Sequence, residues 1–263
     1  MRILLTNDDG YDAPGINVLR ERLLDDSHEV FMMAPATNQS GTSQSIHMGR
    51  GMKVRELDEG LWVCDGSPAD CVMTAIHGNV FGRPDMILSG INRGPNIGLD
   101  ILYSGTCGAA RQGVLMGIPS VALSVMWPGD EIVGSESEGD YSAMADFAAK
   151  NLKAFAKLAA VAPGGKMPKD RCAFVNVNGM AQERAYKGGR FCGVSFREYK
   201  GDKVVLKDLG GGLYERTFSG GQVNSAGREY SDYDACVEGF AAVTRVCAEP
   251  TAAPTLDGID FKV

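Results

Sequence analysis

The chain has 263 residues, of which 44% are apolar and 22% are charged, and its formal net charge at pH 7 is −7. This length and composition predict a sizeable folded core, as one large domain or two small ones, and exclude collagen-like and disordered classes because the glycines follow no repeat. The negative charge argues against a DNA-binding surface, although phosphate can still be held in a local site.

The seven cysteines are scattered along the chain and form no Cys-x-x-Cys pair. This pattern indicates free thiols in a reducing compartment, not a disulfide framework or a zinc site. The N-terminus lacks the pattern of a signal peptide, and no run approaches the roughly 20 apolar residues of a membrane span. We therefore expect a cytoplasmic protein without membrane partners.

The first two thirds of the chain alternate predicted strands and helices. Strands are predicted for Arg2–Asn7, His28–Pro35, Met86–Ser89, Ser120–Val125 and Cys172–Asn178, and helices for Pro14–Leu24, Ser67–His77, Thr106–Met116 and Tyr141–Leu158. Ser67 is the expected cap of its helix, with Pro68 in the first helical position. This rhythm predicts an α/β fold with a mostly parallel sheet and helices on both faces.

After about residue 185 the pattern changes. Strands are predicted for Phe191–Phe196, Val204–Leu209 and Leu213–Phe218, with turns at Gly201-Asp202 and Gly210–Gly212. We expect residues 1–185 to form the α/β core and residues 186–263 to form a β-rich extension that reaches a neighbouring subunit. The acidic stretch Asp130–Tyr141 is predicted to be a loop.

Four polar, glycine-rich segments stand at predicted strand ends. They are NDDG (Asn7–Gly10), NQSGTS (Asn38–Ser43), SGINRGPN (Ser89–Asn96) and YSGT (Tyr103–Thr106). In a parallel sheet, ligands bind beyond the carboxyl ends of the strands. The four segments together therefore predict one binding site more specifically than any of them does alone.

The adjacent carboxylates of Asp8 and Asp9 repel each other, and a divalent cation would offset this repulsion. Hard cations such as Mg²⁺ prefer oxygen ligands. A Ser40 hydroxyl and an Asn92 amide oxygen would complete the set of ligands that the protein supplies. Such a cation would polarise a phosphoryl group and bring water into line. The alternatives are a turn with a helix-capping aspartate at NDDG, loop residues that satisfy backbone groups at NQSG, and a structural turn at SGINRGPN.

The YSGT segment leads into a predicted helix. The N–H groups at the N-terminus of a helix favour an anion, and Ser104 and Thr106 add hydroxyl groups. The alternative is that Ser104 or Thr106 only caps the helix. Among the three histidines, His47 follows the Ser40 segment and is the one that can approach the site, whereas His28 and His77 are expected in packing or surface positions.

The sequence resembles the SurE family of stationary-phase survival proteins, which are 5′/3′-nucleotidases. The resemblance is carried by TNDDGYDAPGI, APATNQSG, GSPADCV, SGINRGPNIG and DILYSGT, in the order of the family, and by the later FVNVN and SDYDACVEGFAAVT. Two departures stand out: Met180 replaces the proline that usually ends the NVN motif, and the stretch from Lys187 to Gly221 matches only loosely.

The resemblance implies a Rossmann-like core and a 5′-nucleotidase that hydrolyses nucleoside monophosphates, with 3′-nucleotides and short polyphosphate as further substrates. It implies one divalent cation per subunit, Mg²⁺ or Mn²⁺, on Asp8, Asp9, Ser40 and Asn92. It places Asn96, Ser104, Gly105 and Thr106 in the phosphate pocket, and it implies a homodimer or homotetramer with exchanged C-terminal extensions.

Asp8 and Asp9 are the catalytic candidates, with Asp9 expected to orient the attacking water. The sequence does not identify the acid that protonates the leaving group. Two other functions stay open. A signalling receiver module also binds Mg²⁺ with an acidic pair after its first strand, but Asn92 stands where a strand-end aspartate would be needed. A nucleotide-binding protein or transferase without hydrolysis is the second alternative.

Overall fold

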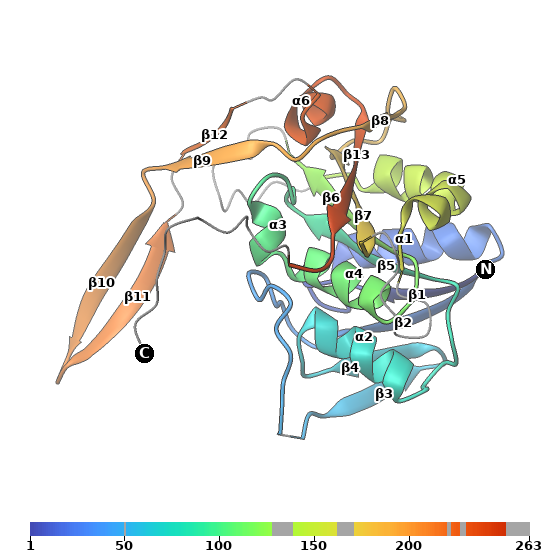
Figure 1. Ribbon diagram of the computed structural model, residues 1–263. Coiled ribbons are helices and arrows are strands. Elements are labelled where there is room, and N and C mark those ends of the chain that lie inside the picture. Colours follow the sequence, from blue (N-terminus) through green and yellow to red (C-terminus); the bar gives the residue numbers. More distant parts are fainter. Residues whose placement is uncertain (50, 128–138, 162–170, 220–221, 227–229, 251–263) are drawn as a thin grey trace, which may run out of the picture.

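The computed structural model describes residues 1–49, 51–127, 139–161, 171–219, 222–226 and 230–250. Its main sheet contains the strands β1 (Arg2–Thr6), β2 (Glu29–Pro35), β3 (Val54–Asp58), β4 (Leu61–Cys64), β5 (Met86–Arg93), β6 (Ser120–Met126), β7 (Ala173–Met180), β8 (Gly189–Phe191) and β13 (Ala241–Cys247). Their spatial order is β3-β4-β2-β1-β5-β6-β7-β13-β8. Only the β3–β4 and β7–β13 pairings of this sheet are antiparallel, so the predicted α/β class with a mostly parallel sheet is confirmed (Figure 1).

The helices are α1 (Pro14–Asp25), α2 (Pro68–His77), α3 (Asp100–Tyr103), α4 (Gly105–Leu115), α5 (Ser142–Leu158) and α6 (Asp232–Val237). Each longer predicted helix is confirmed to within one residue of its predicted ends. Ser67 caps α2 as expected, and its side chain accepts a hydrogen bond from the backbone N–H of Asp70. Pro68 occupies the first helical position, where its missing N–H has no intrahelical partner to lose.

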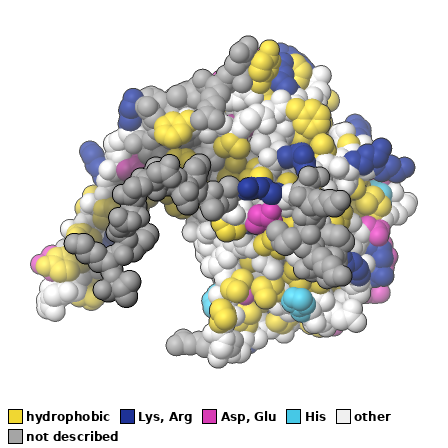
Figure 2. All heavy atoms as spheres, viewed as in Figure 1, with side chains coloured by type: hydrophobic (Ala, Val, Ile, Leu, Met, Phe, Trp, Pro, Cys, Tyr) yellow, Lys and Arg dark blue, Asp and Glu magenta, His cyan; other side chains and the backbone are white. Residues whose placement is uncertain are grey.

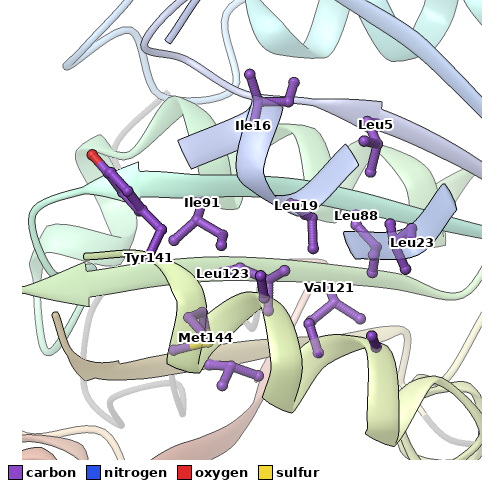
Figure 3. Packing of buried hydrophobic residues seen from close by; sticks show 14 of the residues in the cluster. Leu5, Ile16, Leu19, Leu23, Leu88, Ile91, Val121, Leu123, Tyr141 and Met144 are labelled. Atoms are coloured by element: carbon purple, nitrogen blue, oxygen red, sulfur yellow. The ribbon is translucent and has the colours of Figure 1, made fainter. Parts of the chain in front are cut away.

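Helices cover both faces of the sheet because the central strands are apolar on both sides. In β1, Ile3 and Leu5 face the cluster that includes α1 and α5, whereas Leu4 faces the cluster with α2 and α4. Successive side chains of a strand point to opposite faces, so the continuous apolar run of β1 serves both layers. Figure 3 shows the first cluster, in which Leu19 of α1 and Met144 of α5 meet strand residues such as Leu123.

Strand β5 extends further than predicted. The expected end at Ser89 was wrong, because Gly90, Ile91, Asn92 and Arg93 continue the strand, with an irregular register against β6. Gly90 has φ +131°, and a Cβ there would lie 2.2 Å from the backbone oxygen of Leu123. Only glycine lets β5 and β6 approach this closely, and the bend beyond it leads into the polar segment.

The prediction of a strand at Phe191–Phe196 was also wrong. The chain leaves β8 at Phe191 and enters β9 (Phe196–Lys200) at Phe196. Between them, the backbone N–H groups of Cys192, Gly193 and Ser195 donate to Val243, Tyr230 and Asp232 respectively. Because these partners lie on β13 and around the start of α6, no regular ladder forms there.

The elements absent from the prediction are β3, β4, β8, β9, β12 (Gln222–Ala226), β13 and the short helices α3 and α6. The boundary predicted at residue 185 does not coincide with the edge of the sheet, because β8 and β13 lie beyond it in sequence and pair within the sheet. The division into two domains stays a prediction. Most of the acidic segment predicted as a loop, residues 130–138, lies outside the described residues.

Strands β10 (Lys203–Gly210) and β11 (Leu213–Ser219) form an antiparallel hairpin, and β9 pairs with β12. The two predicted hairpin strands and the turn at Gly210–Gly212 are confirmed. Figure 1 shows the hairpin projecting from the body of the molecule as an arm. Within the described ranges, no helix has the length and apolar character needed to cross a bilayer.

Candidate active site

Asp8 follows β1 directly and is held by the first turn of α4. The hydroxyl of Thr106 donates to Asp8 Oδ1 at 2.6 Å, and the backbone N–H of Thr106 donates to Asp8 Oδ2 at 3.0 Å. The side chain is buried, and this burial raises its pKa although the Thr106 bonds favour the charged form. The carboxylate of Asp8 therefore has a fixed orientation at the N-terminus of α4.

Asp9 lies beside Asp8 and is held by the end of β5. The backbone N–H of Arg93 donates to Asp9 Oδ2 at 3.0 Å. Burial and the negative charge of Asp8 raise the pKa of Asp9 to about 7. Two carboxylates at this position are therefore costly to ionise together unless positive charge is added.

The remaining two metal-ligand candidates belong to the same edge of the sheet. Asn92 is 8% exposed, and its Nδ2 donates to the backbone oxygen of Gly94 at 2.8 Å, so its Oδ1 is the atom suited to bind a cation. Ser40 is exposed, and its loop is tied to the site because the N–H of Gln39 donates to the backbone oxygen of Asp8 at 2.6 Å. The parallel pairing of β1 with β5 places the two aspartates and Asn92 at neighbouring strand ends.

The donor atoms of this set fit a hard divalent cation. Two carboxylates, one amide oxygen and one hydroxyl are all oxygen ligands, which Mg²⁺ and Mn²⁺ prefer. No group of three or more His, Cys, Asp or Glu side chains suited to a metal occurs among the described residues. A cation at Asp8 and Asp9 would therefore depend on the neutral oxygens of Ser40 and Asn92 as well.

The predicted phosphate-pocket residues from YSGT form the start of α4. Ser104 caps the helix, its Oγ accepting a hydrogen bond from the N–H of Cys107 at 3.0 Å, so the capping alternative is confirmed for this residue. Gly105 lies against Asp8, since a Cβ built on it would be 2.9 Å from the Asp8 Cβ. The hydroxyl of Thr106 is engaged by Asp8, as described above, so Thr106 also orients the neighbouring carboxylate.

Asn96 is fixed by a layer of buried polar residues that sequence reasoning missed. Its side-chain nitrogen donates to Ser124 Oγ at 2.7 Å, and its backbone N–H donates to Asn178 Oδ1 at 2.8 Å. Its backbone oxygen accepts hydrogen bonds from the side chains of Asn176 and Asn178. The signal for these residues was NVN in β7, where two asparagines two apart must share one face.

His47, which the sequence left unplaced, is paired with a residue of α2. Its Nδ1 lies 2.7 Å from Asp70 Oδ2, and its side chain is 51% exposed. Asp70 also accepts a hydrogen bond from the N–H of Ser67, completing the capping box of α2. This pair stands close to the start of α4, because Pro68 packs against Gly105.

Residues 3–201 match the family model described as Survival protein SurE. The chain belongs to the SurE family. Its relatives include two proteins that carry the name 5′-nucleotidase SurE. The protein from Desulfitobacterium hafniense is 43% identical over 58% of this chain and 59% of its own length. The protein from Geotalea daltonii is 36% identical over 93% of this chain and 92% of its own length. The crystal structure of the SurE protein from Aquifex aeolicus superposes with a TM-score of 0.74 at 31% identity, covering 95% of each chain.

Proposed function

We propose that the protein is a 5′-nucleotidase, a phosphoric monoester hydrolase that splits nucleoside monophosphates into nucleoside and phosphate with the help of a divalent cation. The observation that carries this proposal is the adjacent pair of Asp8, buried against the N-terminus of α4, and Asp9, half-buried against the end of β5. The N-terminus of a helix favours an anion, and two neighbouring carboxylates favour a cation. Together they suit a phosphate that is bound to a metal ion. The names of the SurE relatives support the same activity.

One cation per subunit, Mg²⁺ or Mn²⁺, would be held by Asp8, Asp9, Ser40 and Asn92. When bound, it supplies the positive charge that lets both carboxylates ionise and that polarises a phosphoryl oxygen. The raised pKa values of Asp8 and Asp9 support this assignment, because they show that the folded chain alone does not compensate the two charges. The all-oxygen donor set supports a hard cation without distinguishing Mg²⁺ from Mn²⁺.

The chain's own residues would then bind and orient the reactants. The start of α4 would face the phosphate with the positive end of its helix dipole at Gly105 and with Ser104, whose Oγ accepts from the N–H of Cys107. Asn96, locked by Asn178 and Ser124, contributes a further donor of fixed position. Asp9, whose Oδ2 is held by Arg93, orients the attacking water through its other oxygen. The same site would accept 3′-nucleotides and short polyphosphate, because both present a phosphate group to it.

The arm supports a proposed homodimer or homotetramer. Every residue of β10 and β11 is exposed, including Val204, Leu206, Leu213 and Phe218. A lone two-stranded hairpin is at best marginally stable in water. Exposed apolar side chains on such a hairpin indicate a surface that binds another protein surface. Figure 2 shows hydrophobic side chains on the arm, away from the main body. We propose that a second copy of this chain packs against the arm.

The seven cysteines are free and mostly buried, which favours a reducing compartment, and we propose the cytoplasm. The activity is tested by phosphate release from purine and pyrimidine nucleoside 5′- and 3′-monophosphates, with EDTA or with added Mg²⁺ or Mn²⁺. We expect release that EDTA abolishes and that either cation restores. Tight nucleotide binding without phosphate release would instead support a binding protein or a transferase.

A further inference from the structure

His47 and Asp70 make a two-point contact between the loop that follows Ser40 and the first turn of α2. The backbone N–H of His47 donates to Asp70 Oδ1 at 3.0 Å, and His47 Nδ1 lies 2.7 Å from Asp70 Oδ2. The side chain of Asp70 is 3% exposed, whereas that of His47 is 51% exposed. A carboxylate anchored in the fold therefore holds an imidazole that is open to solvent and to a ligand.

The contact also determines which ring nitrogen can exchange a proton. Burial opposes the charge of Asp70, but hydrogen bonds from His47 and Ser67 outweigh it and lower the pKa of Asp70. An ionised carboxylate only accepts hydrogen bonds, so His47 Nδ1 carries a hydrogen. The other nitrogen, Nε2, is left to gain and release a proton, which is how a carboxylate prepares a histidine for proton transfer.

The helix that carries Asp70 touches the phosphate end of the site. Pro68, in the first turn of α2, packs on Gly105 of α4: a Cβ built on Gly105 would lie 3.1 Å from Pro68 Cγ. The same Cβ would lie 2.9 Å from the Cβ of Asp8. The anchor of His47 is thus two residues from a contact with the proposed phosphate pocket.

The loop that carries His47 wraps the same region. It leaves the site at Gln39, whose N–H donates to the backbone oxygen of Asp8, and it passes the end of α3, where the N–H of Ser43 donates to the backbone oxygen of Tyr103 at 2.9 Å. The hydroxyl of Ser67 at the start of α2 donates to the backbone oxygen of Ser45. His47 therefore lies beside the first turn of α2, on a loop that is tied to Asp8 at its other end.

We propose that His47 is the general acid of the reaction, with Nδ1 held by Asp70 and protonated Nε2 facing the leaving oxygen of the nucleotide. This inference rests on the proposed nucleotidase activity. As the water oxygen bonds to phosphorus, the bond from phosphorus to the ester oxygen breaks. The water proton passes to Asp9, and the proton of Nε2 passes to the ester oxygen, which leaves as the nucleoside hydroxyl. Solvent then reprotonates His47 and accepts the proton from Asp9.

The test separates proton donation from loop anchoring. In His47→Asn the amide nitrogen takes the place of Nδ1, so the bond to Asp70 is kept and the acid is lost. A nucleoside 5′-monophosphate leaves as a strongly basic alkoxide and needs the proton, whereas p-nitrophenyl phosphate leaves as a weakly basic phenolate and does not. We expect kcat for the nucleotide to fall on the order of 10²-fold, with little change for p-nitrophenyl phosphate. His77→Asn, at the exposed end of α2, is the matched control and should leave both rates unchanged.

Three results would overturn the proposal in distinguishable ways. If His47→Asn hydrolyses both substrates like the wild type, the pair only anchors the loop. If both substrates slow equally, His47 contacts the phosphate and not the leaving group. A wild-type protein that is inactive toward both substrates with Mg²⁺ or Mn²⁺ would overturn the proposed activity itself, and the role of His47 with it.

Discussion

Thr106 gives both of its donors to one carboxylate: its hydroxyl binds Asp8 Oδ1 at 2.6 Å and its backbone N–H binds Asp8 Oδ2 at 3.0 Å. The two residues are 98 positions apart, and this contact joins the end of β1 to the start of α4. Because the carboxylate is buried, each bond is made away from competing water. The bidentate contact thus aims a candidate metal ligand at the anion-favouring end of a helix.

Replacing Thr106 by valine removes the hydroxyl at nearly constant volume. We expect the free energy of unfolding to fall by about 1–3 kcal/mol, because a buried acceptor loses its donor. The affinity for Mn²⁺ and kcat/KM for a nucleotide should fall as well, since one of the two bonds that orient Asp8 is lost. Urea unfolding, metal titration and steady-state kinetics measure these effects. Thr106→Ser keeps the hydroxyl and should lie near the wild type; equal loss in both variants would contradict a role for the hydrogen bond.

Gly105 leaves no room for a side chain beside Asp8. An alanine Cβ would lie 2.9 Å from the Asp8 Cβ and 3.0 Å from Asp8 Oδ2. We expect Gly105→Ala to displace the carboxylate, to destabilise the fold by about 1–3 kcal/mol and to lower metal affinity and activity together. Gly51→Ala is the control, because its Cβ would meet open space and its φ is not in the left-handed region. Wild-type activity in Gly105→Ala would show that the position of Asp8 is not critical.

Asn178 holds both backbone polar groups of Asn96. Its Oδ1 accepts from the Asn96 N–H at 2.8 Å, and its Nδ2 donates to the Asn96 oxygen at 3.2 Å. We expect Asn178→Val to cost about 1–3 kcal/mol of stability and to raise KM for the nucleotide, because Asn96 would shift within the pocket. Asn151→Ala on α5 serves as the remote control. An unchanged KM in a destabilised Asn178→Val protein would place Asn96 outside the phosphate pocket.

The raised pKa of Asp9 predicts how pH affects the metal-free protein. The pKa is about 7 in the folded state against 3.8 for the free group, so the folded chain binds more protons than the unfolded chain between these values. The contribution of Asp9 to stability is therefore present at low pH and decreases as pH rises from about 4 to about 7. The raised pKa of Asp8 acts in the same direction.

Thermal unfolding with EDTA measures this effect. The Tm of the wild type should fall across this pH window more steeply than that of Asp9→Asn, which lacks the titrating carboxylate. Mn²⁺ should raise the wild-type Tm most at pH 8, above the pKa of Asp9, and should do little at pH 5. A Tm increase with Mn²⁺ that is the same at both pH values, or the same in Asp9→Asn, would argue against this metal site.

The arm provides a separate prediction about assembly. Val204 pairs with Phe218, and Leu206 pairs with Arg216, so Val204, Leu206 and Phe218 share one face of the hairpin. We expect the double variant Leu206→Glu and Phe218→Glu to shift the protein to monomers in analytical ultracentrifugation, because charges are costly in a covered apolar surface. Thr217→Glu on the opposite face is the control. A wild type that is monomeric at all concentrations would refute the proposed assembly.

The sequence alone determined most of the α/β core and the list of candidate ligands. Hydrophobic periodicity and caps are local signals, so α1, α2, α4 and the strands β1, β2, β5, β6 and β7 could be placed to within a few residues. The four polar segments could be assigned to one edge because parallel strands share the direction of their carboxyl ends. The resemblance to the SurE family supplied the proposed activity, and the match to the family model confirms the family.

Only the tertiary structure decided how those residues are held and which others join them. The bonds from Thr106 to Asp8, from Asn178 to Asn96 and from His47 to Asp70 link residues 98, 82 and 23 positions apart, and no local pattern encodes such pairings. The return of β13 to the sheet has the same cause, since a short strand is stabilised by neighbours that are distant in sequence. The candidate ligands could thus be predicted from their residue types and local sequence. Their orientation and charge depend on contacts with residues that are distant in sequence.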